Sequence, residues 1–220
     1  MTSTKESPLL GIFDLLFSTY GPQGWWPGDS AFEVIVGAIL TQNTAWQNVA
    51  RAIANLKREG LLEATTLLEA DPETVKALIA PAGFFNVKYD RLMNVLQYLV
   101  GRSIDLERFR HLPAADLRGE LLEVSGIGPE TADSILLYAF QRPVFVVDAY
   151  TRRLFSRLGY AWMVKAHYDD VQKYFMGELA SDVGLYNEFH ALIVLHCKDT
   201  CKMRPLCSEC CLSSLCVARP

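Results

Sequence analysis

The chain has 220 residues, of which 50% are hydrophobic and 21% are charged, and its formal net charge is −4. This composition is typical of a globular protein and excludes a largely disordered chain. The apolar runs are far shorter than the roughly 20 residues that a membrane helix needs, and the N-terminal segment lacks a basic-then-apolar leader pattern. We therefore expect a cytoplasmic protein that does not enter a membrane.

The first half of the sequence predicts short helices separated by Gly, Pro and polar loops. The expected helices lie at about 1–20, at 31–40, through Val49 and Leu56 to about Gly60, and at about 61–69, 72–79 and 88–100. The loops between them carry a set of aromatic side chains: Trp25, Trp26, Trp46, Phe84 and Phe85. Aromatic side chains in loops either pack in the core or contact a ligand, and for Trp26 and Phe85 both interpretations are open.

A glycine-rich turn divides the segment from Leu117 to Arg157. The helix that begins near Leu117 is interrupted by Gly126-Ile127-Gly128, and Pro129 then stands at the first position of a second helix. Two glycines around an apolar residue allow so tight a turn that consecutive N–H groups and the positive end of the second helix face outward together. This turn, hairpin 126–128, is therefore expected to bind phosphate.

The second half of the chain continues with an extended apolar connector, 144–147, and helices at about 149–158, 168–179 and 185–196. The expected fold class is all-α. We expect two helical lobes with hairpin 126–128 between them: residues 31–140 form one lobe, and residues 1–30 with 141–220 form the other.

The net charge of −4 conceals an uneven distribution. Residues 1–140 carry 11 basic and 17 acidic side chains, whereas residues 141–220 carry 10 basic and 8 acidic ones. The basic excess includes Arg152, Arg153 and Arg157, with no acidic residue between Asp148 and Asp169. A focused basic patch of this kind can bind a phosphate backbone with modest affinity that falls steeply with salt.

All six cysteines follow residue 196, which is unlike the spread of structural disulfides in a secreted domain. Cys201, Cys207, Cys210 and Cys216 form the pattern C-x5-C-x2-C-x5-C, which predicts a local metal or cluster site. A zinc ion is one possible occupant. Cys197 is an alternative first ligand.

The pattern Val124-x-Gly126-Ile127-Gly128-x-x-Thr131-Ala132, followed by Val147-Asp148, resembles the helix-hairpin-helix DNA glycosylases, the superfamily of endonuclease III. The resemblance covers nearly the whole chain. It implies a monomeric base excision repair enzyme whose partner is double-stranded DNA with a damaged base. It also implies a structural [4Fe–4S] cluster on the four cysteines of the C-x5-C-x2-C-x5-C pattern, although the family's first gap is usually one residue longer.

The same resemblance implies that Asp148 is the catalytic carboxylate, which stabilises the positive charge that develops on the sugar. An Asp before a helix is also a good N-cap, and both roles can coexist. Glu130 stands where enzymes that also cut the strand carry a lysine. Because a carboxylate cannot form an imine, we expect a monofunctional glycosylase that uses water. Lys88 and Lys165 are expected to be solvated surface lysines.

Four segments, TrpTrpPro, GAILTQNT, PAGFFN and GPETADSILLYA, resemble one branch of the superfamily, the monofunctional 3-methyladenine DNA glycosylases. By that resemblance, Trp25, Pro27 and Trp46 sandwich the flipped base, and an electron-rich slot favours a cationic methylated purine. The resemblance also implies that Gln42 is the wedge, the residue that fills the gap left by the extruded base, and that Phe84 inserts from another loop as its partner. The other residues implied to contact DNA are Gly126, Ile127, Gly128, Thr131 and Arg152.

Two other functions remain open at the level of sequence. One is an endonuclease III-like glycosylase and lyase for oxidised pyrimidines or mismatched thymine. The other is a non-catalytic DNA-binding protein, because helix-hairpin-helix units also serve purely to hold phosphates.

Overall fold

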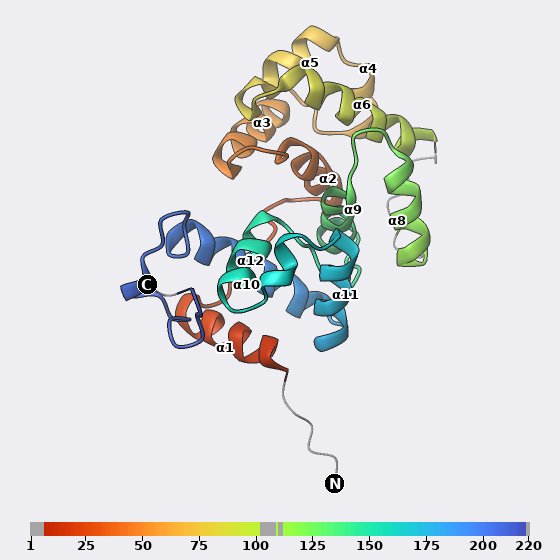
Figure 1. The fold of residues 1–220 in the computed structure, drawn as a ribbon. Coiled ribbons are helices and arrows are strands. Elements are labelled where there is room, and N and C mark those ends of the chain that lie inside the picture. The colour runs from red at the N-terminus through yellow and green to blue at the C-terminus, as the bar shows by residue number, and fades with distance from the viewer. Residues whose placement is uncertain (1–6, 102–108, 110–111, 219–220) are drawn as a thin grey trace. The chain divides into compact units, whose positions relative to one another are not determined.

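The computed structural model describes residues 7–101, 109 and 112–218. Every regular element in these ranges is a helix, which confirms the all-α fold class. The α-helices are α1 (Pro8–Tyr20), α2 (Ala31–Leu40), α3 (Trp46–Arg58), α4 (Ala64–Glu69), α5 (Pro72–Ile79), α6 (Phe85–Gly101), α8 (Ala114–Glu123), α9 (Pro129–Ser134), α10 (Ala149–Arg157), α11 (Tyr168–Glu178) and α12 (Val183–Asp199) (Figure 1). Short 3-10 helices cover Ala80–Ala82, Ala161–Val164 and Cys207–Glu209.

The structure differs from the expected elements at several helix ends and in the type of one helix. Helix α6 begins at Phe85, three residues before the expected start at Lys88. The second helix of the hairpin is α-helical only to Ser134 and continues as a π-helix, η2 (Ile135–Ala139), in which the Phe140 N–H donates to the Ile135 carbonyl. The connector 144–147 is extended and unpaired with any strand in the described part of the chain, as expected.

The described chain forms two compact units. One contains residues 26–142, and the other contains residues 1–25 and 143–220. The division expected from the sequence places these boundaries at 30/31 and 140/141.

The unit of residues 26–142 is built around α2, whose side chains are buried on every side after the first residue. Ser30 caps this helix, since its hydroxyl accepts a hydrogen bond from the Glu33 N–H at 3.2 Å. Helices α3, α6 and α9 and the π-helix η2 all pack against α2. An apolar helix of this kind is stable only where neighbours cover all its faces.

A buried ion pair joins the two helices of the hairpin. Arg118 on α8 contacts both carboxylate oxygens of Asp133 on α9, at 2.7 and 3.2 Å. The Asp133 side chain is completely buried. Two parallel hydrogen bonds fix the relative orientation of α8 and α9, and with it the geometry of the turn between them.

The other unit has an aromatic core. Phe145, from the connector, stacks on Phe175 of α11 with ring centroids 4.2 Å apart and planes 6° apart. Phe189 of α12 meets Phe145 edge-on, and Phe155 of α10 meets Phe175 in the same way. Helix α1 packs against α12 and buries Leu9, Ile12 and Leu16. The connector is therefore an integral part of this core.

Among the residues that the structure describes, no helix is long and apolar enough to cross a membrane.

Replacing Arg118 by alanine is expected to destabilise the protein by about 3 kcal/mol, because the substitution leaves the Asp133 carboxylate buried without its guanidinium. Unfolding in urea measures the difference. Arg58→Ala is the matched control, since Arg58 and its partner Glu59 are both exposed, and its expected cost is below about 1 kcal/mol. Equal losses for the two variants would contradict a structural role for the Arg118–Asp133 pair.

Candidate functional site

Hairpin 126–128 is a tight turn in the unit of residues 26–142. Gly126 has φ +92°, and a Cβ at this position would collide with the Arg91 side chain. Ile127 is buried, and its N–H donates to the Val124 carbonyl at 3.0 Å. The turn therefore anchors itself through Ile127, while Gly126 and Gly128 remain exposed.

Gln42 hydrogen-bonds to this hairpin. Its Nε2 donates to the Gly126 carbonyl at 3.2 Å and to the Thr131 hydroxyl at 2.9 Å. Its Oε1 accepts a hydrogen bond from Arg91 Nη1. Thr131 is buried, and its hydroxyl accepts the hydrogen bond from Gln42. The roles of Gln42 and Thr131 in binding DNA stay predictions.

The expectation that Lys88 is a solvated surface lysine is wrong. Its side chain is 1% exposed, and Nζ donates to the carbonyls of Leu40 at 2.8 Å and Ala82 at 2.7 Å. Leu40 ends α2 and Ala82 ends the 3-10 helix Ala80–Ala82, so Lys88 binds the C-terminal carbonyls of both. Burial, with a smaller effect of Arg91, lowers the pKa of Lys88 to about 8. Lys165 is exposed, as expected.

Three aromatic side chains contact one another in the same unit. The Trp26 ring lies 5.1 Å from that of Trp46, nearly perpendicular to it, and 5.1 Å from that of Tyr138 on η2. A Cβ at Gly37 would lie 3.2 Å from Trp26 Nε1, so glycine allows the indole to lie close against α2. Trp26 is therefore a packing aromatic that supports Trp46.

The remaining candidates for contact with a base or with DNA differ in exposure and in location. Phe84 has φ +47° and a side chain that is 73% exposed, which is unusual for a large apolar residue. Pro27 is exposed. Trp25 belongs to the other unit, where Lys198 Nζ lies 6.0 Å from its ring centroid. The predicted pocket residues Trp25, Pro27 and Trp46 are thus distributed over both units, and their role stays a prediction.

Asp148 is the N-cap of α10. Its Oδ1 accepts hydrogen bonds from the N–H of Thr151 at 2.7 Å and from the Thr151 hydroxyl at 2.9 Å. Its Oδ2 lies 3.6 Å from Nε2 of His190 on α12. Burial by itself raises the pKa of this carboxyl, but His190 and the two Thr151 bonds outweigh it and hold the pKa below its usual value. Asp148 is therefore ionised at neutral pH.

The connector fixes where Asp148 lies. Its backbone is bound by two side chains of α11: Gln172 Nε2 donates to the Phe145 carbonyl at 2.7 Å, and the Val147 N–H donates to the Tyr168 hydroxyl at 3.2 Å. Phe145 itself is fully buried. The carboxylate is thus attached to a rigid core on one side and to a helix on the other.

The arginines after Asp148 form hydrogen bonds within the protein. Arg152 donates to the carbonyls of Met163 and Ala166. Arg153 donates to the carbonyls of Cys197 and Cys201, each at 3.0 Å. Because these guanidinium groups hold the backbone in place, any contact of Arg152 with DNA stays a prediction.

The four predicted cysteine ligands line one cavity. Cys201, Cys207, Cys210 and Cys216 surround it together with the apolar residues Pro205 and Leu206, and its empty volume, including the open mouth, is about 290 Å³. Cys197 does not line this cavity, and its Sγ lies 3.5 Å from the Tyr150 carbonyl. All six cysteines lie in the described part of the chain and none forms a disulfide.

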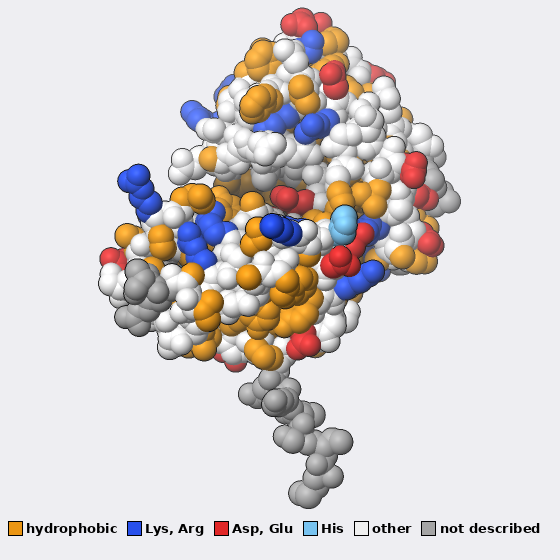
Figure 2. Space-filling view, in the orientation of Figure 1, with side chains coloured by type: hydrophobic (Ala, Val, Ile, Leu, Met, Phe, Trp, Pro, Cys, Tyr) orange, Lys and Arg blue, Asp and Glu red, His pale blue; other side chains and the backbone are white. Residues whose placement is uncertain are grey.

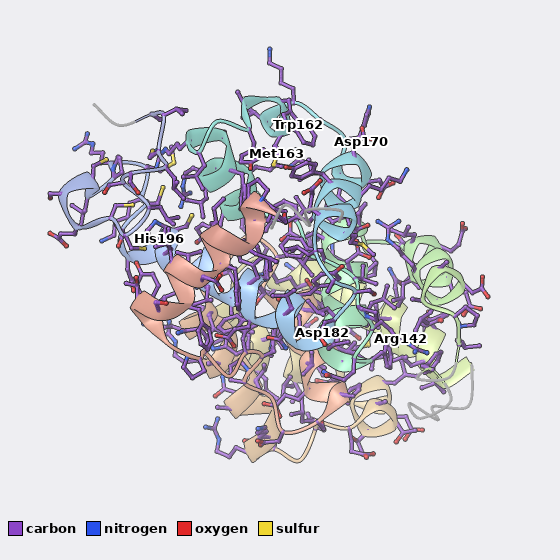
Figure 3. The ribbon with its side chains drawn as sticks, turned by 90° about the horizontal axis from the view of Figure 1, so that it is seen from below. Arg142, Trp162, Met163, Asp170, Asp182 and His196 are labelled. Atoms are coloured by element: carbon purple, nitrogen blue, oxygen red, sulfur yellow. The ribbon has the colours of Figure 1, made fainter. Side chains whose placement is uncertain are left out.

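Two groups donate toward these thiols. Arg157 Nη1 lies 3.1 Å from Cys201 Sγ. The neighbouring Cys197 thiol and then Arg157 lower the pKa of Cys201. His196 is fully buried at the end of α12, with Nδ1 2.8 Å from the Tyr20 hydroxyl and Nε2 3.5 Å from Cys210 Sγ (Figure 3).

Burial lowers the pKa of His196 to about 4, so this imidazole is neutral and can donate to a thiolate. Four thiols around one cavity, with such donors beside them, fit a group held by four thiolates. Within the described residues, no three His, Cys, Asp or Glu side chains converge closely enough to hold one metal ion.

Comparison with known proteins places the chain in a family. Residues 36–180 match the HhH-GPD superfamily of base excision DNA repair proteins. A proposed DNA repair glycosylase of Methanocaldococcus jannaschii is 47% identical to this chain and aligns over 100% of both proteins. Endonuclease III of Sulfolobus acidocaldarius is 31% identical over 85% of this chain and 82% of its own length.

Solved structures show the same fold. The 3-methyladenine DNA glycosylase MagIII of H. pylori, solved with 1,N6-ethenoadenine, has a TM-score of 0.71 and 27% identity over 86% of this chain and 97% of its own. An endonuclease III–DNA complex has a TM-score of 0.78 and 20% identity over 96% and 94%. The chain belongs to the HhH-GPD superfamily of base excision DNA repair proteins. Its enzyme class is DNA glycosylase.

Replacing His190 by glutamine is expected to raise the pKa of Asp148, because the imidazole is lost while both Thr151 hydrogen bonds remain. Carboxyl carbon NMR during a pH titration measures this, with Asp148→Asn to assign the signal. A depressed carboxyl pKa stabilises the fold above the ordinary Asp pKa, and this stabilisation is lost as pH falls through the lower value. The His190→Gln variant should therefore lose stability at a higher pH than the parent protein.

Asp71 provides the internal control for this titration. It caps α5 and accepts hydrogen bonds from the Thr74 N–H and hydroxyl, both at 2.8 Å, which lower its pKa. The pKa of Asp71 should not change in the His190→Gln variant. An unchanged pKa for Asp148 as well would exclude His190 as a determinant of its ionisation.

Proposed function

We propose that this DNA glycosylase is monofunctional and releases alkylated purines such as 3-methyladenine from double-stranded DNA by hydrolysis. The observation that carries the proposal is Asp148, a carboxylate held ionised in a largely buried position by Thr151 and His190. A fixed negative charge of this kind stabilises the positive charge that develops on the sugar as the glycosidic bond breaks, and it orients the attacking water.

Glu130 and Lys88 support hydrolysis without strand cleavage. Glu130, in the first turn of α9, occupies the position of the family's imine-forming lysine, and a carboxylate cannot form an imine. Lys88, in the same unit, is buried and uses its ammonium group to bind two carbonyls. Water is therefore the expected nucleophile.

The aromatic residues support an alkylated purine as the substrate. Trp46 is held by Trp26, which packs in turn on Tyr138. N3- and N7-methylated purines carry positive charge, so they leave easily, and an electron-rich ring binds them more tightly than neutral bases by about 0.5–2 kcal/mol. The similarity to MagIII, a 3-methyladenine DNA glycosylase, points to the same substrate class.

Binding to DNA is expected to be modest and sensitive to salt. The net charge of the chain is −4. On the face shown in Figure 2, Lys and Arg side chains are scattered among acidic and hydrophobic ones and form no continuous stripe. Phosphate binding would therefore depend on hairpin 126–128 and on a few basic side chains, so affinity should fall as salt rises.

We also propose that Cys201, Cys207, Cys210 and Cys216 hold a [4Fe–4S] cluster. The four thiols line one cavity, which supports a group shared by all four. When bound, the cluster would tie together the loop of residues 201–216, whose regular structure is one 3-10 turn. Arg157 and His196 would donate hydrogen bonds to the thiolates of Cys201 and Cys210.

The proposed activity is tested by incubating the enzyme with methylated duplex DNA and measuring the bases that it releases. We expect release of 3-methyladenine or 7-methylguanine and a loss of about a hundredfold or more in Asp148→Asn. Asparagine also caps helices well, so this variant should still fold, and thermal unfolding measures the stability that is lost with the carboxylate. Absence of any released methylated base would refute the proposed substrate.

Borohydride distinguishes this proposal from an endonuclease III-like lyase. A monofunctional enzyme forms no imine, so reduction during turnover should trap no covalent enzyme–DNA adduct. A trapped adduct would overturn the interpretation of Glu130. The lysine whose replacement abolishes the adduct would then be the nucleophile.

The cluster is tested by iron and sulfide analysis and by visible absorbance of protein purified without oxygen. Cys207→Ala is expected to lose the absorbance band and most of the iron, because one of the four ligands is missing. Cys211→Ala is the matched control, since Cys211 adjoins Cys210 but does not line the cavity. Zinc in place of iron, in a colourless protein, would favour the alternative occupant.

A further inference from the structure

A row of polar side chains runs along one face of α6. Lys88, Arg91 and Asn94 are spaced three residues apart, so they project from the same side of the helix. Their contacts tie α6 to neighbouring segments of the unit of residues 26–142. Lys88 binds the carbonyls of Leu40 and Ala82, and Asn94 Nδ2 donates to the Ser125 carbonyl at 3.0 Å.

Arg91, in the middle of the row, contacts two predicted DNA-binding residues at once. Its aliphatic stem covers Gly126 so closely that no Cβ could fit there. Its guanidinium donates to Oε1 of Gln42. One side chain therefore touches both the hairpin that is expected to bind phosphate and the expected wedge.

The contact with Arg91 determines how the Gln42 amide is oriented. Arginine has donors and no acceptor, so only the carbonyl oxygen of the amide can face it. The Nε2 group is thereby directed to the Gly126 carbonyl and the Thr131 hydroxyl, and it binds both. All of these contacts lie within one compact unit.

We propose that Arg91 is a positioning residue, which acts through Gln42 and holds the wedge in a fixed register with hairpin 126–128. The proposal rests on the DNA-binding roles assigned above to Gln42 and the hairpin. A side chain that is already ordered before DNA binds loses less conformational entropy on insertion. Arg91 thus favours binding to DNA from which a base has been extruded, rather than binding to duplex DNA in general.

The test uses Arg91→Met, Gln42→Ala and the double variant. Methionine retains an apolar stem over Gly126 and removes the guanidinium. Gln97→Ala is the matched control, because Gln97 is an exposed residue on the same helix. Arg91→Lys, which retains one donor for Gln42, is a second variant that keeps the test valid if Arg91→Met folds poorly, as judged by thermal unfolding.

The measurement is the equilibrium affinity for two duplexes, one undamaged and one with a tetrahydrofuran abasic analogue, across a series of salt concentrations. Arg91→Met should weaken binding to the abasic duplex by about tenfold and leave binding to the undamaged duplex within about twofold. In the Gln42→Ala background the same substitution should have an effect below about twofold. Arg91→Lys should lie between the parent protein and Arg91→Met.

Two results would overturn the proposal. Equal losses for both duplexes, with the salt dependence reduced by about one phosphate contact, would make Arg91 a direct phosphate ligand. Full additivity of Arg91→Met and Gln42→Ala would mean that Arg91 does not act through Gln42.

The binding test of Arg91 can succeed or fail independently of the test for release of alkylated purines. Binding to an abasic duplex requires no catalysis and no alkylated base. If the protein bound this duplex selectively but released no methylated purine, the proposed substrate would fail while the role of Arg91 would remain testable. A 2-aminopurine base placed opposite the abasic site adds a signal that a stability defect alone would not change, since its fluorescence reports unstacking by the inserted residue.

Discussion

The arrangement of residues 26–142 depends on the backbone at Gly126. Its φ of +92° is unfavourable for any residue with a Cβ, and the Arg91 stem leaves no space for one. Only at this turn can Ile127 enter the core while Pro129 starts α9. The Gly126 carbonyl then accepts a hydrogen bond from Gln42, so the same turn also holds the loop that follows α2.

Asp148 shows how one side chain can satisfy both a structural and a chemical requirement. A helix cap needs an oxygen acceptor at a fixed position, and Thr151 supplies the donors. Those donors also favour the ionised carboxyl that glycosidic chemistry needs. Asp71 has the same pair of contacts from Thr74 but is an exposed cap. The difference at Asp148 comes from burial and from the imidazole of His190.

The sequence predicts the helices well because their ends are set by local chemistry: Asp71 before α5, Pro129 at the start of α9, and Gly21 after α1. The spacing of the cysteines is also local, and the four predicted ligands line one cavity in the structure. His190, Arg91 and the burial of Lys88 were missed because their partners are far away in the chain. The change to a π-helix at Ile135–Ala139 has no local pattern in the sequence that predicts it.

One consequence of the two units concerns synthesis of the chain. Residues 26–142 are contiguous, whereas the other unit combines residues 1–25 with residues 143–220. On the ribosome, the contiguous unit can complete its core while the second unit still lacks most of its residues. Helix α1 precedes the contiguous unit in the chain, yet its residues Leu9, Ile12 and Leu16 are covered only when α12 follows. The apolar face of α1 is thus left without its packing partner until α12 has been made.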